Sequence, residues 1–148
     1  DYKLILVGAE DKKQNIRNLV NELNITDRVE FTGLISREDV FRKLNSASIY
    51  LSSSKVEGLP VSVLEAMRVG LVPVISDIKP HLEIANKCKF VNVLPLNLEK
   101  WVTKIKYYGE LNQQDFEIQV NTIKEYVKDQ YSLEEMHKEY LSIYKKLV

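Results

Sequence analysis

The sequence predicts an α/β fold, a Rossmann-like parallel sheet with helices on both faces. Short apolar runs of strand length alternate with segments of helical periodicity, which implies right-handed crossovers between parallel strands. The first run ends at Gly8, as a buried parallel strand does when it enters a loop. After the fifth run the pattern is helical only, so we expect helices appended to the C-terminal side of the sheet.

Five segments have the composition of strands. They lie at residues 3–8, 29–33, 47–53, 72–77 and 89–93. Each is short and rich in aliphatic or aromatic residues, as buried strands are. Pro73 lies in the fourth segment and should cost that strand one ladder hydrogen bond, because proline has no N–H.

Apolar stripes and capping residues predict the helices. Asp11 can cap a first helix, Ser36 begins a second with Asp39 three residues later, and residues 61–69 form a third. The stripe of the first helix is Ile16, Leu19, Val20 and Leu23. The C-terminal stripes are Leu98, Val102 and Ile105; Phe116, Val120, Ile123 and Val127; and Leu133, Met136, Tyr140, Tyr144 and Leu147. Ser132 and Glu135 form a capping box before the last stripe.

The bulk composition fits one globular domain spanning residues 1–148. The chain is 45% hydrophobic and 28% charged, and its 21 basic and 21 acidic residues cancel. A net charge of zero argues against a nucleic-acid partner bound through a broad basic field. The single cysteine, Cys88, cannot form an internal disulfide; we expect a buried, inert thiol and a reducing compartment. No apolar run approaches the ~20 residues of a membrane span.

Two carboxylates frame the start of the helix at residues 61–69. Glu57 precedes it and Glu65 lies in its second turn, so both can face the crevice where open α/β sheets bind ligands. Pro60 suits the first helical position, and Gly58 allows close approach of a ligand. The N–H groups of Val61, Ser62 and Val63 would then form an anion site at the helix start. Carboxylates accept hydrogen bonds from hydroxyls, so the site suits a sugar nucleotide, although a glutamate early in a helix is also common for structural reasons alone.

Other polar and aromatic residues have plainer interpretations. Lys79 and His81 lie in a presumed loop after the fourth strand, near the crevice. We expect both to be solvated, with contact to a bound phosphate as the alternative for His81, and Glu83 could begin a helix. Trp101, Tyr107 and Tyr108 follow helical spacing and should pack rather than stack on sugars. The lysines near the C-terminus alternate with acidic residues and indicate a solvated helix face, with weak attraction to a membrane surface as the alternative.

Several segments resemble a known family in the same order along the chain. Residues 57–67, EGLPVSVLEAM, resemble the donor-site motif of retaining glycosyltransferases with the GT-B fold, of the large group 1 (family 4) type. The other matching segments are residues 4–8, 27–33, 70–77 with 83–84, and 131–134. The resemblance covers nearly the whole chain and corresponds to the C-terminal, donor-binding half of a GT-B enzyme.

The resemblance implies a role for each site residue. Glu57 would be catalytic and contact the transferred sugar, and Glu65 would hold the ribose hydroxyls. Backbone around Gly58, Leu59, Pro60 and Val61 would serve the sugar and the diphosphate. Leu34 and Ile35 would lie against the nucleobase, and Gly8 would close the strand beside the donor. The donor would be a UDP- or GDP-linked hexose, with no metal and no further cofactor.

The resemblance also implies parts that this chain lacks. The acceptor, a saccharide or lipid-linked saccharide, would bind an absent N-terminal domain, so we expect the fragment alone to be inactive. We find no counterpart of the family's upstream Arg and Lys, and the central strand before residues 4–7 is absent. Residues preceding Asp1, a strand from another chain or a rearranged sheet could replace that strand.

The implied parent enzyme transfers a hexose to an acceptor hydroxyl in bacterial capsular polysaccharide, cell-surface polysaccharide or glycolipid synthesis. It would be cytoplasmic, with peripheral association at the inner face of the membrane as a further expectation. The alternatives are a sugar-nucleotide epimerase of the same fold and a non-catalytic domain that binds nucleotide sugars or a protein partner.

Overall fold

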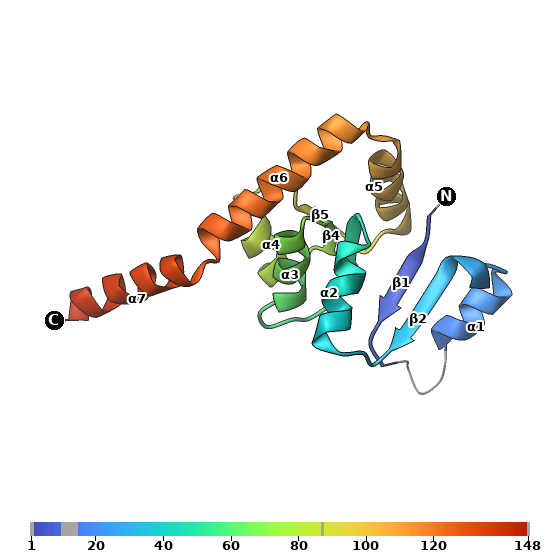
Figure 1. Cartoon of the computed structure of the whole chain (residues 1–148), viewed down its shortest axis with the longest axis horizontal. Helices are drawn as coiled ribbons and strands as arrows, with labels where there is room; N and C mark the ends of the chain where they lie inside the picture. The colour runs from blue at the N-terminus through green and yellow to red at the C-terminus, as the bar shows by residue number, and fades with distance from the viewer. Residues whose placement is uncertain (1, 10–14, 87, 148) are drawn as a thin grey trace. The chain divides into compact units, whose positions relative to one another are not determined.

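The computed structural model describes residues 2–9, 15–86 and 88–147, and every strand pairing in it is parallel (Figure 1). The strands are β1 (Leu4–Val7), β2 (Val29–Gly33), β3 (Ile49–Ser52), β4 (Val72–Ser76) and β5 (Asn92–Leu94). β1 pairs with β2 in one sheet, and the other sheet has the order β3-β4-β5. Parallel strands connected through helices confirm the predicted α/β, Rossmann-like fold.

The chain divides into two compact units, residues 1–46 and residues 47–148, and each is described by itself. The prediction of one domain over residues 1–148 stays a prediction. The prediction that a central strand before residues 4–7 is absent also stays a prediction.

The first unit contains the two-stranded sheet and short helices. Its helices are α1 (Asn15–Glu22), the 3-10 turn η1 (Thr26–Arg28) and α2 (Arg37–Asn45). Ser36 caps α2 as predicted, because its Oγ accepts a hydrogen bond from the Asp39 N–H at 3.1 Å. Of the stripe predicted for α1, Val20 is buried, whereas Ile16, Leu19 and Leu23 are exposed. The predicted cap Asp11 lies outside the described residues.

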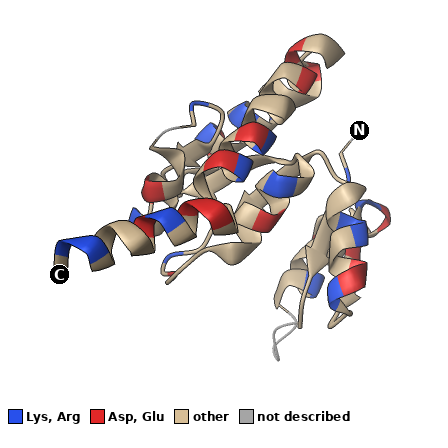
Figure 2. Ribbon diagram, turned by 60° about the vertical axis from the view of Figure 1, so that its left-hand side comes forward, with Lys and Arg blue, Asp and Glu red and all other residues tan. Residues whose placement is uncertain are grey.

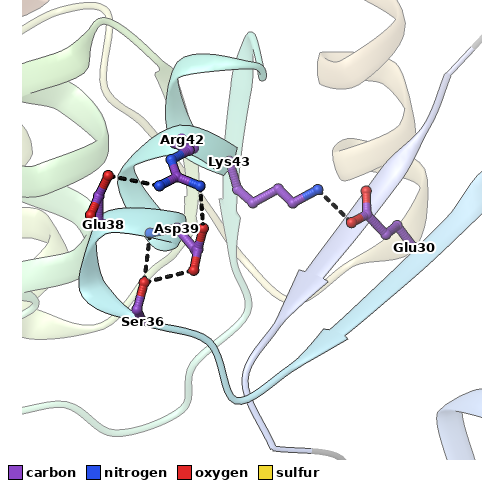
Figure 3. Close-up of polar contacts among 6 residues, drawn as sticks. All are labelled: Glu30, Ser36, Glu38, Asp39, Arg42 and Lys43. Atoms are coloured by element: carbon purple, nitrogen blue, oxygen red, sulfur yellow. Dashed lines mark hydrogen bonds and ion pairs between the residues drawn. The ribbon is translucent and has the colours of Figure 1, made fainter.

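Ion pairs on α2 are arranged around its first turns (Figure 3). Arg42 contacts Glu38 at 2.7 Å and Asp39 at 2.8 Å, and Lys43 reaches Glu30 of β2 at 2.5 Å. Most of these side chains are well exposed, so the pairs contribute little to stability. Their role is local, since they tie the start of α2 to its second turn and its end to the sheet.

The second unit holds the main core. Its helices are α3 (Val61–Val69), α4 (Lys79–Ala85), α5 (Leu98–Glu110), α6 (Gln113–Gln130) and α7 (Leu133–Leu147). Every residue of β4 is buried, because this strand is central and helices pack against it. Pro73 therefore lies inside a central strand, where proline is rare; its carbonyl accepts a hydrogen bond from Asn92 Nδ2 at 3.1 Å.

A buried polar chain links the sheet to α5 and α6. Asn92 Nδ2 donates to the Tyr108 hydroxyl at 2.8 Å, and that hydroxyl donates to Gln119 Oε1 at 3.3 Å. Tyr108 and Gln119 are both buried. Tyr108 and the partly buried Trp101 pack on the core as predicted, whereas Tyr107 is 45% exposed.

One predicted strand boundary and one presumed loop are wrong. β5 begins at Asn92 rather than at residue 89, because the chain leaves α4 through turns in which Cys88 N–H donates to Ala85 O and Val91 N–H donates to Cys88 O. The presumed loop around His81 is the helix α4, with Pro80 in its first turn, where proline suits a helix start.

α7 contains no buried residue among those described. The Ser132 side chain accepts a hydrogen bond from the Glu135 N–H at 3.1 Å, which confirms the predicted cap. Basic and acidic residues both occur along this helix (Figure 2), and Lys138 pairs with Glu135 at 3.2 Å. The lysines of this helix thus form the predicted solvated face. Within the described ranges, no helix is both long enough and apolar enough to cross a bilayer.

Candidate functional site

Pro60 shapes the loop that joins β3 to α3. The prediction that Pro60 begins the helix is wrong, because the helix begins at Val61 and Pro60 is its N-cap, with φ −79° and ψ 69°. These angles are those of an inverse γ-turn, and Val61 N–H accordingly donates to Leu59 O at 2.9 Å. The turn brings the loop sharply into the helix, and it buries Pro60.

The anion site predicted at the start of α3 is smaller than expected. Val61 N–H is bonded to Leu59 O, and Val63 N–H donates to Pro60 O at 3.1 Å. Of the three N–H groups predicted to face a ligand, only that of Ser62 has no backbone partner among the residues described. One exposed donor and the positive end of the helix dipole remain available to a phosphate.

Glu57 is held by residues of two other elements. Its Oε1 accepts a hydrogen bond from Ser52 Oγ, at the end of β3, at 3.3 Å. The same oxygen lies 3.6 Å from Nε2 of His81 on α4. The Glu57 side chain is 20% exposed, and the contacts found within the described residues engage only Oε1. The carboxylate is therefore fixed through one oxygen, which orients the other.

His81 is fully buried, so the prediction that it is a solvated loop residue is wrong. It lies on the inner face of α4, and its Nδ1 is 2.8 Å from the backbone carbonyl of Ser76 at the end of β4. Lys79 and Glu83 of the same helix are exposed. His81 therefore belongs with Glu57, whereas the two charged residues on its helix face solvent.

Glu57 and Glu65 both act on the Tyr50 hydroxyl. Burial raises the pKa of the Tyr50 phenol above 10.0, the hydrogen bond to Ser62 opposes this, and the negative charges of Glu57 and Glu65 raise the pKa further. The hydroxyl donates to Ser62 Oγ at 2.8 Å. The prediction that Glu57 and Glu65 face one crevice stays a prediction.

The loop between these carboxylates is open to solvent. Leu59 is 70% exposed and Val61 49% exposed. A Cβ built on Gly58 would meet no atom within 4 Å, so the space above this glycine is open to a ligand. The hollow on α7 lined by Leu133, Met136 and His137 contains none of the predicted site residues.

Gly8, Leu34 and Ile35 lie in the first unit. Gly8 has φ +128°, a conformation that favours glycine, and its N–H donates to Gly33 O at 3.1 Å. Leu34 is 84% exposed and Ile35 is half-buried. Their predicted roles beside the donor stay predictions.

Comparison with known proteins places the chain among transferases. A family model described as glycosyl transferases group 1 matches residues 1–139. The chain belongs to this family. Within the family, the chain is similar to an uncharacterized glycosyltransferase of Haemophilus influenzae, with 28% identity over 97% of this chain and 40% of the relative.

A second relative has a named reaction. Over 58% of this chain and 23% of the relative, the chain is 28% identical to a GDP-mannose:cellobiosyl-diphosphopolyprenol alpha-mannosyltransferase of Xanthomonas oryzae pv. oryzae. The chain thus spans two fifths or less of the length of these group 1 glycosyltransferases.

Solved structures share the fold of this group 1 domain. The crystal structure of Anabaena HepE, in complex with UDP and glucose, matches 97% of this chain and 40% of that chain, with a TM-score of 0.81 and 15% identity. At this identity the likeness concerns the fold alone. Together with solved glycosyltransferases of the same fold, it confirms the predicted GT-B half.

The sequence of this group 1 domain predicted Glu57 as a site residue but not its contacts with Ser52 and His81, nor the contact of Ser76 with His81. Ser52 and Ser76 end β3 and β4, and the carboxyl ends of parallel strands are where a ligand crevice forms. That position is a signal the sequence contained. Among the described residues no group of three or more His, Cys, Asp or Glu side chains could hold a metal ion, and the expectation of a metal-independent protein stays a prediction.

Proposed function

We propose that the chain is the nucleotide-sugar donor-binding domain of a retaining glycosyltransferase. The parent protein would transfer a hexose from a nucleoside diphosphate to an acceptor hydroxyl. The observation that carries the proposal is the position of the two acids at the junction of β3 and α3: Glu57 lies in the loop with Oε1 held by Ser52, and Glu65 lies in the helix that begins at Val61. Membership of group 1 glycosyltransferases supports a donor of this class.

Each carboxylate has a separate task in this proposal. Glu65 lies on a regular helix, one turn beyond Val61, and accepts hydrogen bonds from the ribose hydroxyls. Glu57 lies in the loop with Oε1 fixed, and its outward oxygen accepts from the transferred sugar. The Ser62 N–H and the helix dipole stabilise charge that develops on the leaving diphosphate.

The donor is a UDP- or GDP-linked hexose. A mannosyltransferase relative whose name specifies GDP-mannose supports the guanine nucleotide, and the similar fold of HepE, solved with UDP and glucose, supports the uracil nucleotide. The acceptor is a saccharide or lipid-linked saccharide held outside this chain, in the synthesis of bacterial capsular or cell-surface polysaccharide or of glycolipid. The parent works in the cytoplasm, at the inner face of the membrane.

Titration of the protein with UDP, GDP and ADP, followed by NMR, tests the binding function. We expect shifts at Gly58, Leu59 and Val61 with one base preferred. A folded sample that binds none of the three nucleotides would contradict the proposal.

Variants of the two acids separate their tasks. Glu65→Gln should weaken the binding of free nucleotide about tenfold or more, because a hydrogen bond to a charged group contributes ~1.5–3 kcal/mol. Glu57→Gln should instead remove the extra affinity that the sugar contributes. Equal effects of both variants on free nucleotide would show that the assignment is wrong.

The chain by itself should bind the donor without transferring its sugar efficiently. It spans about 40% of the Haemophilus relative, and the acceptor is assigned to the remainder. Robust transfer from UDP-glucose or GDP-mannose to a saccharide by purified residues 1–148 would overturn this part of the proposal.

A further inference from the structure

One ring nitrogen of His81 is an unusual feature of this unit. Its Nε2 is buried and has no hydrogen-bond partner among the described residues. The group nearest to it is Glu57 Oε1, at 3.6 Å, which is ion-pair range but longer than a hydrogen bond. A buried polar atom without a partner is costly, so this contact needs a physical explanation.

The other ring nitrogen determines what Nε2 can be. Nδ1 lies 2.8 Å from the Ser76 carbonyl oxygen, which can only accept a hydrogen bond, so Nδ1 carries a proton. A neutral ring would then turn the lone pair of Nε2 toward the carboxylate of Glu57. A second proton on Nε2 converts that contact into an attraction between imidazolium and carboxylate.

Among the described residues, Glu57 is the acidic side chain found within ion-pair distance of His81, and Asp77, between β4 and α4, is exposed. The ionisable groups on α4 or packed near it include Lys79, Glu83, Glu57, Cys88 and Tyr126. Lys79 and Glu83 are exposed. Tyr126 directs its hydroxyl to Ile84 O at 2.7 Å, and Cys88 is a buried thiol. Glu57 is the anion that faces Nε2.

We propose that His81 is a positioning residue that carries a proton on Nε2 and fixes Oε1 of Glu57, leaving the second carboxylate oxygen aimed at the hydroxyls of the donor sugar. The inference rests on the proposed function, because it deepens the role of Glu57. Ser52 on β3 and His81 on α4 hold one oxygen from two directions. The preference for sugar-bearing over free nucleotide therefore depends on the contact between this pair.

The protonation state can be measured without any ligand. Two-bond ¹⁵N–¹H correlation spectra of the wild-type protein at about pH 6.5 should show both His81 nitrogens protonated, and Glu57→Gln should remove the proton from Nε2. The second histidine, His137, is exposed on α7 and serves as the internal reference. A His81 ring that carries a proton on Nδ1 alone in the wild-type protein would overturn the inference.

Binding experiments test the positioning role. The affinity ratios of UDP-glucose to UDP and of GDP-mannose to GDP should each be measured for the wild type and the variants. For the preferred base, His81→Leu, which keeps bulk but no donor, should lower the ratio about tenfold while leaving the affinity for free nucleotide unchanged. His81→Gln, whose amide can still donate to Oε1, should recover most of the ratio. The matched control His137→Leu should change neither ratio.

The outcomes separate this inference from the function on which it rests. Nucleotide binding with an unchanged sugar ratio in a folded His81→Leu protein refutes the positioning role and leaves the donor site intact. Absence of any nucleotide binding in the wild type refutes both, whatever the protonation of His81. If His81→Leu does not fold, the wild-type spectra and the sugar ratio of His81→Gln support or refute the positioning role in its place.

Discussion

Gly70 ends the helix that carries Glu65, and replacing it by alanine should destabilise the second unit strongly. Its φ is +103°, a region in which a non-glycine residue costs ~1–2 kcal/mol. An added Cβ would lie 2.9 Å from Val120 Cγ1 and 2.5 Å from Lys124 Cε, both on α6. The end of Lys124 can swing aside, but Val120 is packed against the core, and such overpacking costs about 1–3 kcal/mol. We therefore expect Gly70→Ala to lower the free energy of unfolding by about 2–5 kcal/mol.

Urea unfolding followed by tryptophan fluorescence is the assay. The single tryptophan, Trp101, lies in α5, so its signal reports on the second unit. Gly58→Ala is the control, because a Cβ there meets nothing within 4 Å; it should change stability by no more than about 0.5 kcal/mol.

A double variant separates two contributions to the loss of stability in Gly70→Ala: backbone strain with the Val120 contact, and the contact with Lys124. In the Lys124→Ala background, Gly70→Ala should lose nearly as much stability as it does alone, because the flexible lysine contributes least to the clash. A loss below about 1 kcal/mol for Gly70→Ala, or full recovery on removing Lys124, would refute the reasoning from backbone conformation and from Val120.

Three further predictions concern the core of the second unit. Tyr108→Phe should cost about 1–3 kcal/mol in urea unfolding, because Asn92 Nδ2 and Gln119 Oε1 lose a buried partner; an unchanged midpoint would mean that water replaces the hydroxyl. Burial is the main cause that raises the phenol pKa of Tyr126, and interactions with Tyr131 and the charge of Cys88 raise it further. Burial also raises the phenol pKa of Tyr50 and of Tyr108. The stability associated with a raised phenol pKa is present below the ordinary value of 10.0 and is lost as the pH rises above it. The melting temperature should therefore fall above pH 10, and it should fall less steeply in Tyr126→Phe. An equal fall in that variant would contradict the assignment. Burial likewise raises the pKa of the Cys88 thiol, so a thiol reagent at about pH 8 should label Cys88 only as the protein unfolds in urea, and rapid labelling of the native protein would disprove the inert thiol.

Periodicity and turn chemistry predicted most of the fold because they act locally. Residues 61–69 form α3 within the predicted bounds, and Ser36 and Ser132 cap their helices, since each signal depends on neighbours within a few residues. The helix α4 was missed because it is short and has no apolar stripe of its own. Its one local signal was Pro80 in the first turn, which also fits a loop.

The candidate site divides in the same way. The spacing of Glu57 and Glu65 predicted that both would face one side, and this stays a prediction. The γ-turn at Pro60 was not predicted, because ψ of proline is free where φ is not, and a ψ of 69° removed Val61 from the anion site. The burial of His81 depends on how α4 packs against β4, which is a tertiary contact that no local pattern encodes.

Glu57 and Glu65 are chemically identical in the sequence, yet they should respond differently to substitution. Glu57 Oε1 is a partner of Ser52 and faces the buried Nε2 of His81. Truncating Glu57 to alanine would leave that nitrogen with no carboxylate near it, and the cost of an unpaired buried group would be added to any loss of binding. Loss of donor affinity in Glu57→Ala would thus combine a structural and a functional effect. Glu57→Gln keeps an oxygen for Ser52 and removes only the charge. The loss in Glu57→Gln therefore measures the contribution of the charge, and the further loss in Glu57→Ala measures the structural cost of removing the side chain.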